Sequence, residues 1–109
     1  MPKNAGLPPG TLILLILRVL RPGSLHGYAI AQRIRQLSSD QLSVEEGSLY
    51  PALQKLLVNG WVKAEWTTSD TGREVRNYRL TAKGLKQLDA ETDDYQRTVD
   101  AIAAILESA

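Results

Sequence analysis

The chain has 109 residues, which fits a single domain with a modest core, and its formal net charge is only +1. It contains no cysteine, which excludes disulfides and thiolate metal sites and is typical of an intracellular, cytoplasmic protein. His26 is the only histidine, so a histidine zinc site or a Ser-His-Asp triad has little to build on. We therefore expect no metal, no cofactor and no enzymatic activity.

The charges are unevenly distributed along the sequence. Residues 1–81 hold ten Lys and Arg against six Asp and Glu, a balance of +4, whereas residues 82–109 hold three against six, a balance of −3. Segregation of this size can arise by chance, but it also suits a protein whose basic part faces a polyanion.

The N-terminal region predicts an arm followed by a buried helix. Residues 1–8 have no periodicity and are expected to form a flexible arm. The apolar run from Leu12 to Leu20 is compatible with a buried strand or a buried helix, and its length and poor alternation favour the helix. It contains Arg18, is too short to cross a bilayer and lacks a following cleavage site, so we expect no membrane segment and no signal peptide. Pro22 and Gly23 end it.

A second helix is predicted from about Ser24. Its apolar face consists of Ile30, Ile34 and Leu37. Tyr28, in its first turn, could present its phenol to a phosphate or could half-bury its ring, and both interpretations stay open. His26 is expected to be a turn or cap residue rather than a ligand.

The stretch from Ser43 to Gly60 predicts a third helix, joined to the second by the short polar connection 38–42. Its apolar face consists of Leu49, Leu53, Leu56 and Leu57. The opposite face carries small or hydrogen-bonding residues for the most part: Gly47, Ser48, Pro51, Gln54, Lys55 and Val58. The helix starts either at Ser43, which would form a capping box with Glu46, or at Glu45. Pro51 predicts a kink.

After the predicted helix stop at Gly60, the pattern changes from helical to alternating. Residues 61–67 and 74–80 predict two strands of a hairpin, with the turn around Asp70, Thr71 and Gly72. The returning strand is basic, with Arg73, Arg76 and Arg79. Three helices followed by a hairpin give the order of a winged helix-turn-helix, a mainly α fold with a small β-hairpin.

Thr81 is expected to cap a final long helix from Ala82 to about Leu106. Steps of three and four residues define one seam along it: Leu85, Leu88, Thr92, Tyr95, Val99, Ile102 and Leu106. A second copy of the helix is the favoured partner for this seam, and packing back on the first helix is the alternative. The prediction is therefore a DNA-binding domain over residues 1–81 and a dimerisation helix over residues 82–109.

Five segments, LILLIL, HGYAI, GSLYPALQKL, NGWV and NYRLTAKG, together resemble the PadR family of bacterial transcriptional regulators from about Gly10 to Gly84. The resemblance implies a winged-helix homodimer, usually a repressor, whose C-terminal helices form the dimer interface and whose recognition helices enter successive major grooves. In several family members a small aromatic or drug-like ligand relieves repression.

The resemblance assigns DNA contacts to Tyr28 and to the pair Tyr50 and Pro51, with Arg73 or Arg76 as the basic residue of the wing. The chain departs from the family pattern in two places. Glu45 and Glu46 stand where the family often has Ser-Pro, which puts two carboxylates near the phosphates. The last helix has no tryptophan, and Tyr95 is its only aromatic residue.

We hypothesise that the partner is double-stranded DNA, bound as a palindrome by a homodimer. Ser48, Gln54 and Lys55 would face base edges. Gln can form two hydrogen bonds with adenine, and Lys can donate to guanine. The remaining contact residues, Tyr28, Tyr50, Arg73 and Arg76, would hold the phosphates or the minor groove. The main alternative is a winged helix that binds a protein, and a double-stranded RNA binder is a weaker one.

Overall fold

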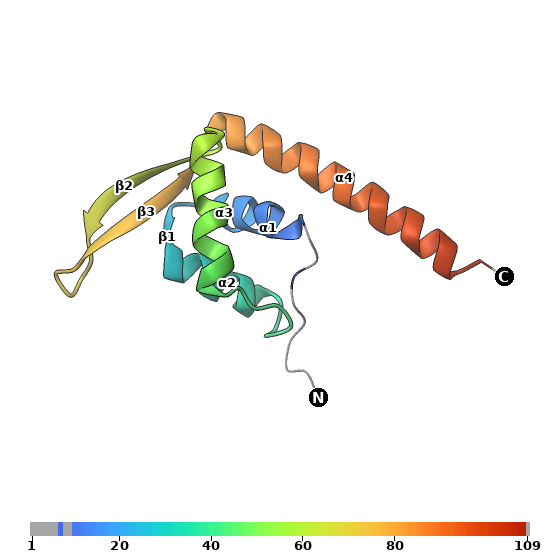
Figure 1. The fold of residues 1–109 in the computed structure, drawn as a ribbon, viewed down its shortest axis with the longest axis horizontal. Coiled ribbons are helices and arrows are strands. Elements are labelled where there is room, and N and C mark those ends of the chain that lie inside the picture. The colour runs from blue at the N-terminus through green and yellow to red at the C-terminus, as the bar shows by residue number, and fades with distance from the viewer. Residues whose placement is uncertain (1–6, 8–9, 109) are drawn as a thin grey trace.

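The computed structural model describes Leu7 and residues 10–108, and these form four helices and a small antiparallel sheet (Figure 1). The elements in chain order are α1 (Thr11–Leu20), β1 (Leu25–His26), α2 (Gly27–Leu37), α3 (Glu46–Val58), β2 (Val62–Thr68), β3 (Glu74–Leu80) and α4 (Ala82–Leu106). The mainly α fold with a hairpin is confirmed. The arm predicted at residues 1–8 lies, except for Leu7, outside the described residues, as does Ala109.

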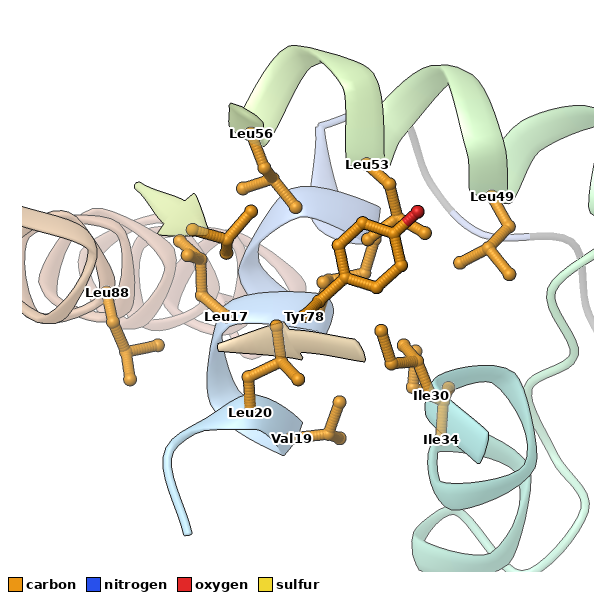
Figure 2. Packing of buried hydrophobic residues seen from close by; sticks show 12 residues of the cluster. Leu17, Val19, Leu20, Ile30, Ile34, Leu49, Leu53, Leu56, Tyr78 and Leu88 are labelled. Atoms are coloured by element: carbon orange, nitrogen blue, oxygen red, sulfur yellow. The ribbon is translucent and has the colours of Figure 1, made fainter. Parts of the chain in front are cut away.

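The core forms where α1, α2 and α3 meet the sheet and the first turns of α4 (Figure 2). Its buried side chains are Ile16, Leu17, Val19, Leu20, Ile30, Ile34, Leu49, Leu53, Leu56, Val62, Tyr78 and Leu88. The predicted apolar faces of the first three helices supply most of them, and full burial of one such aliphatic side chain stabilises the fold by about 1.5–3 kcal/mol. Leu37 is the exception: it was predicted on the apolar face but is 69% exposed, because it is the last residue of α2.

The start of α2 is preceded by a strand that the sequence did not predict. Leu25 and His26 pair antiparallel with Tyr78 and Asn77, so the sheet order is β1-β3-β2. The predicted helix start at Ser24 is therefore wrong, because these two residues are extended and α2 begins at Gly27. His26 is the N-cap of α2, and its Nδ1 accepts a hydrogen bond from the Ala29 N–H at 3.4 Å. Its predicted role as a cap is confirmed.

Both ends of α3 are defined by backbone geometry. The N-cap is Glu45, whose side chain makes no capping hydrogen bond, so the alternative start at Ser43 with a capping box is wrong. At the other end Gly60 adopts φ +74°, its N–H donates to the Leu57 carbonyl, and the Trp61 N–H donates to the Leu56 carbonyl. This is a Schellman motif, which satisfies the last carbonyls and turns the chain into β2.

The long helix α4 begins on the domain and then leaves it (Figure 1). Its bounds agree with the prediction, and the Thr81 hydroxyl caps it by accepting from the Gly84 N–H at 3.0 Å. Leu88 is only 2% exposed and belongs to this chain's own core, which agrees at this position with the alternative of packing back on the first helix. Its role in the interface stays a prediction.

The later turns of α4 make the molecule elongated. The radius of gyration is 15.5 Å, where a compact chain of this length would have about 13 Å. The longest dimension is 60 Å. A helix of this length spans about 37 Å, so much of it extends beyond the domain.

Candidate nucleic-acid interface

The outer face of α3 is exposed and carries the residues predicted to read bases. Ser48, Gln54 and Lys55 are all exposed, and so is Pro51, through which the helix continues. The core leucines of α3 point to the other side (Figure 2). Among the described residues, no carboxylate lies within ion-pair distance of Lys55. The face therefore offers a free cation, an amide and a hydroxyl to a partner.

Two tyrosines flank the beginning of α2. Tyr50 of α3 packs its ring on Gly27, where a Cβ atom would lie 2.9 Å from the phenol oxygen. A larger residue at this position would displace the ring, so the missing side chain of Gly27 leaves room for Tyr50. Tyr28 is 66% exposed, which agrees with the interpretation that it presents its phenol and not with a half-buried ring. Tyr50 is also partly open to solvent, at 47% exposed.

The hairpin of β2 and β3 forms the wing. Its turn is closed by the Ser69 N–H, which donates to the Arg73 carbonyl at 2.7 Å, and by Gly72, which adopts φ +83°. Successive side chains of a strand point to opposite faces. Arg76 therefore shares a face with Tyr78, whereas Arg79 points to the other face and lies near α4.

A groove of about 640 Å³ lies between the start of α2, Tyr50 and the wing. It brings together four of the predicted contact residues: Tyr28, Tyr50, Arg73 and Arg76. Ser48, Gln54 and Lys55 lie outside this groove, on the exposed side of α3. The predicted site is thus divided between a helix face and an adjoining groove with two arginines.

Trp66 is a groove residue that the sequence interpretation missed. It is 66% exposed and stands opposite Arg76 in the β2–β3 register. The Arg76 guanidinium carbon lies 6.0 Å from the centroid of the Trp66 ring and 5.8 Å from that of Tyr78, within the range of cation–π attraction. The alternation of Val62, Ala64 and Trp66 could have revealed it, because it places the indole on the core-side face of the hairpin.

The two carboxylates at the start of α3 are exposed. Glu46 lines a small hollow together with Tyr28 and Arg35. Arg35 is already paired with Asp40, at 3.3 Å. Neither Glu45 nor Glu46 forms an ion pair with any residue that the structure describes. Their negative charge therefore reaches the surface on which the predicted contacts lie.

The outer turns of α4 form a second candidate surface. Four of their apolar side chains are at least 48% exposed: Tyr95, Ile102, Ile105 and Leu106. Leu85, in the first turn of α4, is 38% exposed. A groove of about 620 Å³ separates these turns from the start of α1, with Leu14 on one side and Tyr95, Val99 and Ile102 on the other. Of the predicted seam, only Leu88 is buried within the chain.

Across Leu7 and residues 10–108, no three His, Cys, Asp or Glu side chains are grouped so that they could bind a metal ion. Within the same residues, no helix has the length and apolar character needed to cross a bilayer.

The model of the transcriptional regulator PadR-like family matches residues 16–90. The chain belongs to this family. Its members are transcriptional regulators and not enzymes, in agreement with the expectation from the sequence. The match extends from α1 to the first turns of α4 and therefore includes the helix face and the groove.

The negative transcriptional regulator PadR of Bacillus subtilis is 33% identical over 73 residues. The match covers 67% of this chain and 40% of that protein, so the chain spans about two fifths of the length of this relative.

Solved structures of transcriptional regulators share the fold. A transcriptional regulator from Clostridium thermocellum superposes with a TM-score of 0.83 at 26% identity, over 90% of this chain and 95% of that one. The Bacillus subtilis PadR structure in complex with operator DNA gives a TM-score of 0.68 at 30% identity, over 75% of this chain and 47% of that one. The predicted winged-helix fold and the resemblance to the PadR family are thus both confirmed.

Proposed function

We propose that this PadR-like regulator binds a palindromic operator in double-stranded DNA as a homodimer. The observation that carries the proposal is the adjacency of the exposed Ser48, Gln54 and Lys55 face of α3 to a groove with two arginines and two tyrosines. A helix flanked by phosphate-binding groups is the arrangement that places side chains against base edges in the major groove. The related regulator captured with operator DNA supports the choice of partner.

On this proposal α3, with its caps at residues 45–59, is the recognition helix. Gln54 pairs with adenine and Lys55 donates to guanine, while Ser48 contacts either. Tyr28, Tyr50, Arg73 and Arg76 hold the sugar-phosphate backbone or the minor groove, and Pro51 sets the bend of the helix between them. A regulator of this kind acts on DNA in the cytoplasm.

The proposed dimer forms along α4, from Leu85 in its first turn to Leu106 in its last. Leu85, Tyr95, Val99, Ile102 and Leu106 follow the heptad spacing of a coiled-coil seam, and four of them are exposed in the single chain. Two-fold symmetry then places the two recognition helices in successive major grooves, about one helical turn apart.

We extend the proposal to repression and its relief. The relative from Bacillus subtilis is a negative regulator, which supports repression here. The groove between α1 and α4 has the volume of a small-molecule site and Tyr95 in its wall, which supports a small aromatic or drug-like effector.

The proposal is tested with a duplex recovered from random DNA by the full chain, beside a scrambled duplex of equal length. Gln54→Ala is expected to cost about 1–3 kcal/mol of binding free energy on the recovered duplex and much less on the scrambled one. Arg73→Ala should weaken both alike and lower the slope of log K against log salt by about 1, because it removes one phosphate contact. Fluorescence anisotropy at several salt concentrations measures both effects.

Equal losses on the two duplexes for Gln54→Ala would show that this residue does not read bases. Binding by the unaltered chain that is insensitive to salt would contradict DNA recognition altogether and favour the winged helix as a protein-binding module.

A further inference from the structure

We propose that Trp66 and Arg76 make the wing a sequence-reading element that selects A·T-rich DNA beside each half-site. The inference rests on the proposed DNA-binding function and adds to it a class of target sequence and a positioning residue. In it the Arg76 guanidinium enters the minor groove, and the Trp66 indole holds it there.

The two side chains form an ordered pair on one face of the hairpin. Trp66 and Arg76 are direct partners in the register, and Tyr78 follows Arg76 by two residues on the same face. Arg76 lies within 6.0 Å of both ring centroids. Tyr78 is 4% exposed and fixed in the core, so it anchors the stack, whereas Trp66 is 66% exposed (Figure 2 shows Tyr78 in the core). The guanidinium thus lies near one buried ring and one exposed ring, at distances that permit cation–π attraction to both.

The Arg76 charge is free for a ligand. No Asp or Glu among the described residues lies within ion-pair distance of its guanidinium nitrogens, and the side chain is exposed. Cation–π attraction to aromatic rings orients a guanidinium without using its hydrogen-bond donors. Arg76 therefore reaches a polyanion already oriented, with its donors unoccupied.

The position of the wing fits the minor groove. A seven-residue strand extends about 23 Å, and one turn of B-DNA measures about 34 Å. With α3 in the major groove, the hairpin that starts at its end reaches over the neighbouring minor groove. Minor grooves of A·T-rich tracts are narrow and strongly negative, and arginine is the side chain that they attract.

Arg79 provides the matched comparison. It lies on the same strand three residues later, carries the same charge and points to the opposite face, beside Leu20 and Leu85. If charge alone determined the preference for flanking sequence, Arg76 and Arg79 would contribute to it equally. If the contact with Trp66 determines it, only Arg76 affects the preference.

The experiment uses two duplexes with identical half-sites, taken from a selection with the full chain, and with either A·T-rich or G·C-rich flanks. The unaltered chain should bind the A·T-rich duplex at least about fivefold more tightly. Trp66→Ala and Arg76→Lys should reduce this ratio to about one, because the first removes the exposed ring and the second removes the planar guanidinium. Trp66→Tyr, which keeps a ring, and Arg79→Lys should leave the ratio near its original value.

A ratio near one for the unaltered chain, or a ratio that survives Trp66→Ala, would overturn the inference and leave the proposed function intact. Absence of salt-dependent binding to both duplexes would instead overturn the proposed function, and this inference with it. Far-UV circular dichroism of each variant separates loss of contact from loss of fold.

Discussion

The two ends of α4 have similar apolar periodicity and opposite surroundings. In its first turns Gly84 and Leu88 are buried against the domain. Further along, Ile102, Ile105 and Leu106 are at least 50% exposed. Gly84 and Leu88 pack on the domain, whereas the described residues of the chain leave the apolar side chains of the second part exposed. Periodicity identifies which face of a helix is apolar, but the rest of the fold decides what covers it.

The largest effect is expected where α4 joins the domain. A Cβ atom at Gly84 would overlap the Trp61 carbonyl oxygen and lie 2.8 Å from a Leu80 methyl carbon. Because that carbonyl also accepts a hydrogen bond from the Thr81 N–H, it has little freedom to move. Gly84→Ala should therefore lower the free energy of unfolding by about 1–3 kcal/mol, as measured by denaturant titration followed by circular dichroism.

Gly47→Ala is the control for this variant. Gly47 also lies in the first turn of a helix, but a Cβ there would meet nothing within 4 Å. Alanine is favoured over glycine in a helix by about 0.5–1 kcal/mol, so this variant should be slightly more stable than the unaltered chain. If both substitutions changed the free energy of unfolding by the same amount, the close packing of Gly84 on Trp61 would not be what makes Gly84 necessary.

A smaller effect is expected at the outer end of α4, on association of the chains rather than on folding. In the proposed dimer, Ile102→Glu places two carboxylates in an apolar seam. It should weaken association at least about tenfold, or about 1.4 kcal/mol, with little change in the domain itself. Sedimentation equilibrium measures the association constant.

Ala104→Glu adds the same charge about 200° away around the helix and should leave association nearly unchanged. If both variants, or neither, dissociate the protein, the seam is not where the chains meet.

Local sequence patterns predicted much of the fold. The apolar run, the turn around Gly72 and the Thr81 cap gave helix and hairpin bounds within one or two residues of those observed. Each of these signals depends on neighbours in the chain. The strand Leu25–His26 has no such signal, because two residues show no alternation and their partners on β3 lie about fifty positions away.

The candidate site was predictable to the extent that it depends on one element. The outer face of α3 follows from helical spacing alone, and its residues are exposed as predicted. The groove could not be predicted in this way, because it depends on tertiary packing: Tyr50 packs on Gly27 and lines the groove together with wing residues that are distant in the sequence. Trp66 was missed because the alternating pattern was used only to locate the strands of the hairpin. Used to assign each residue to one of the two faces, the same pattern also places Arg76 and Arg79 on opposite sides.

The central claim is that a symmetric pair of these chains reads DNA through α3. Selection of binding sites from random duplex DNA by the full chain, at two salt concentrations, tests it most directly. The account predicts a palindrome with half-sites about one helical turn apart, and much weaker recovery at the higher salt. Recovery of no common sequence at either salt concentration would contradict it.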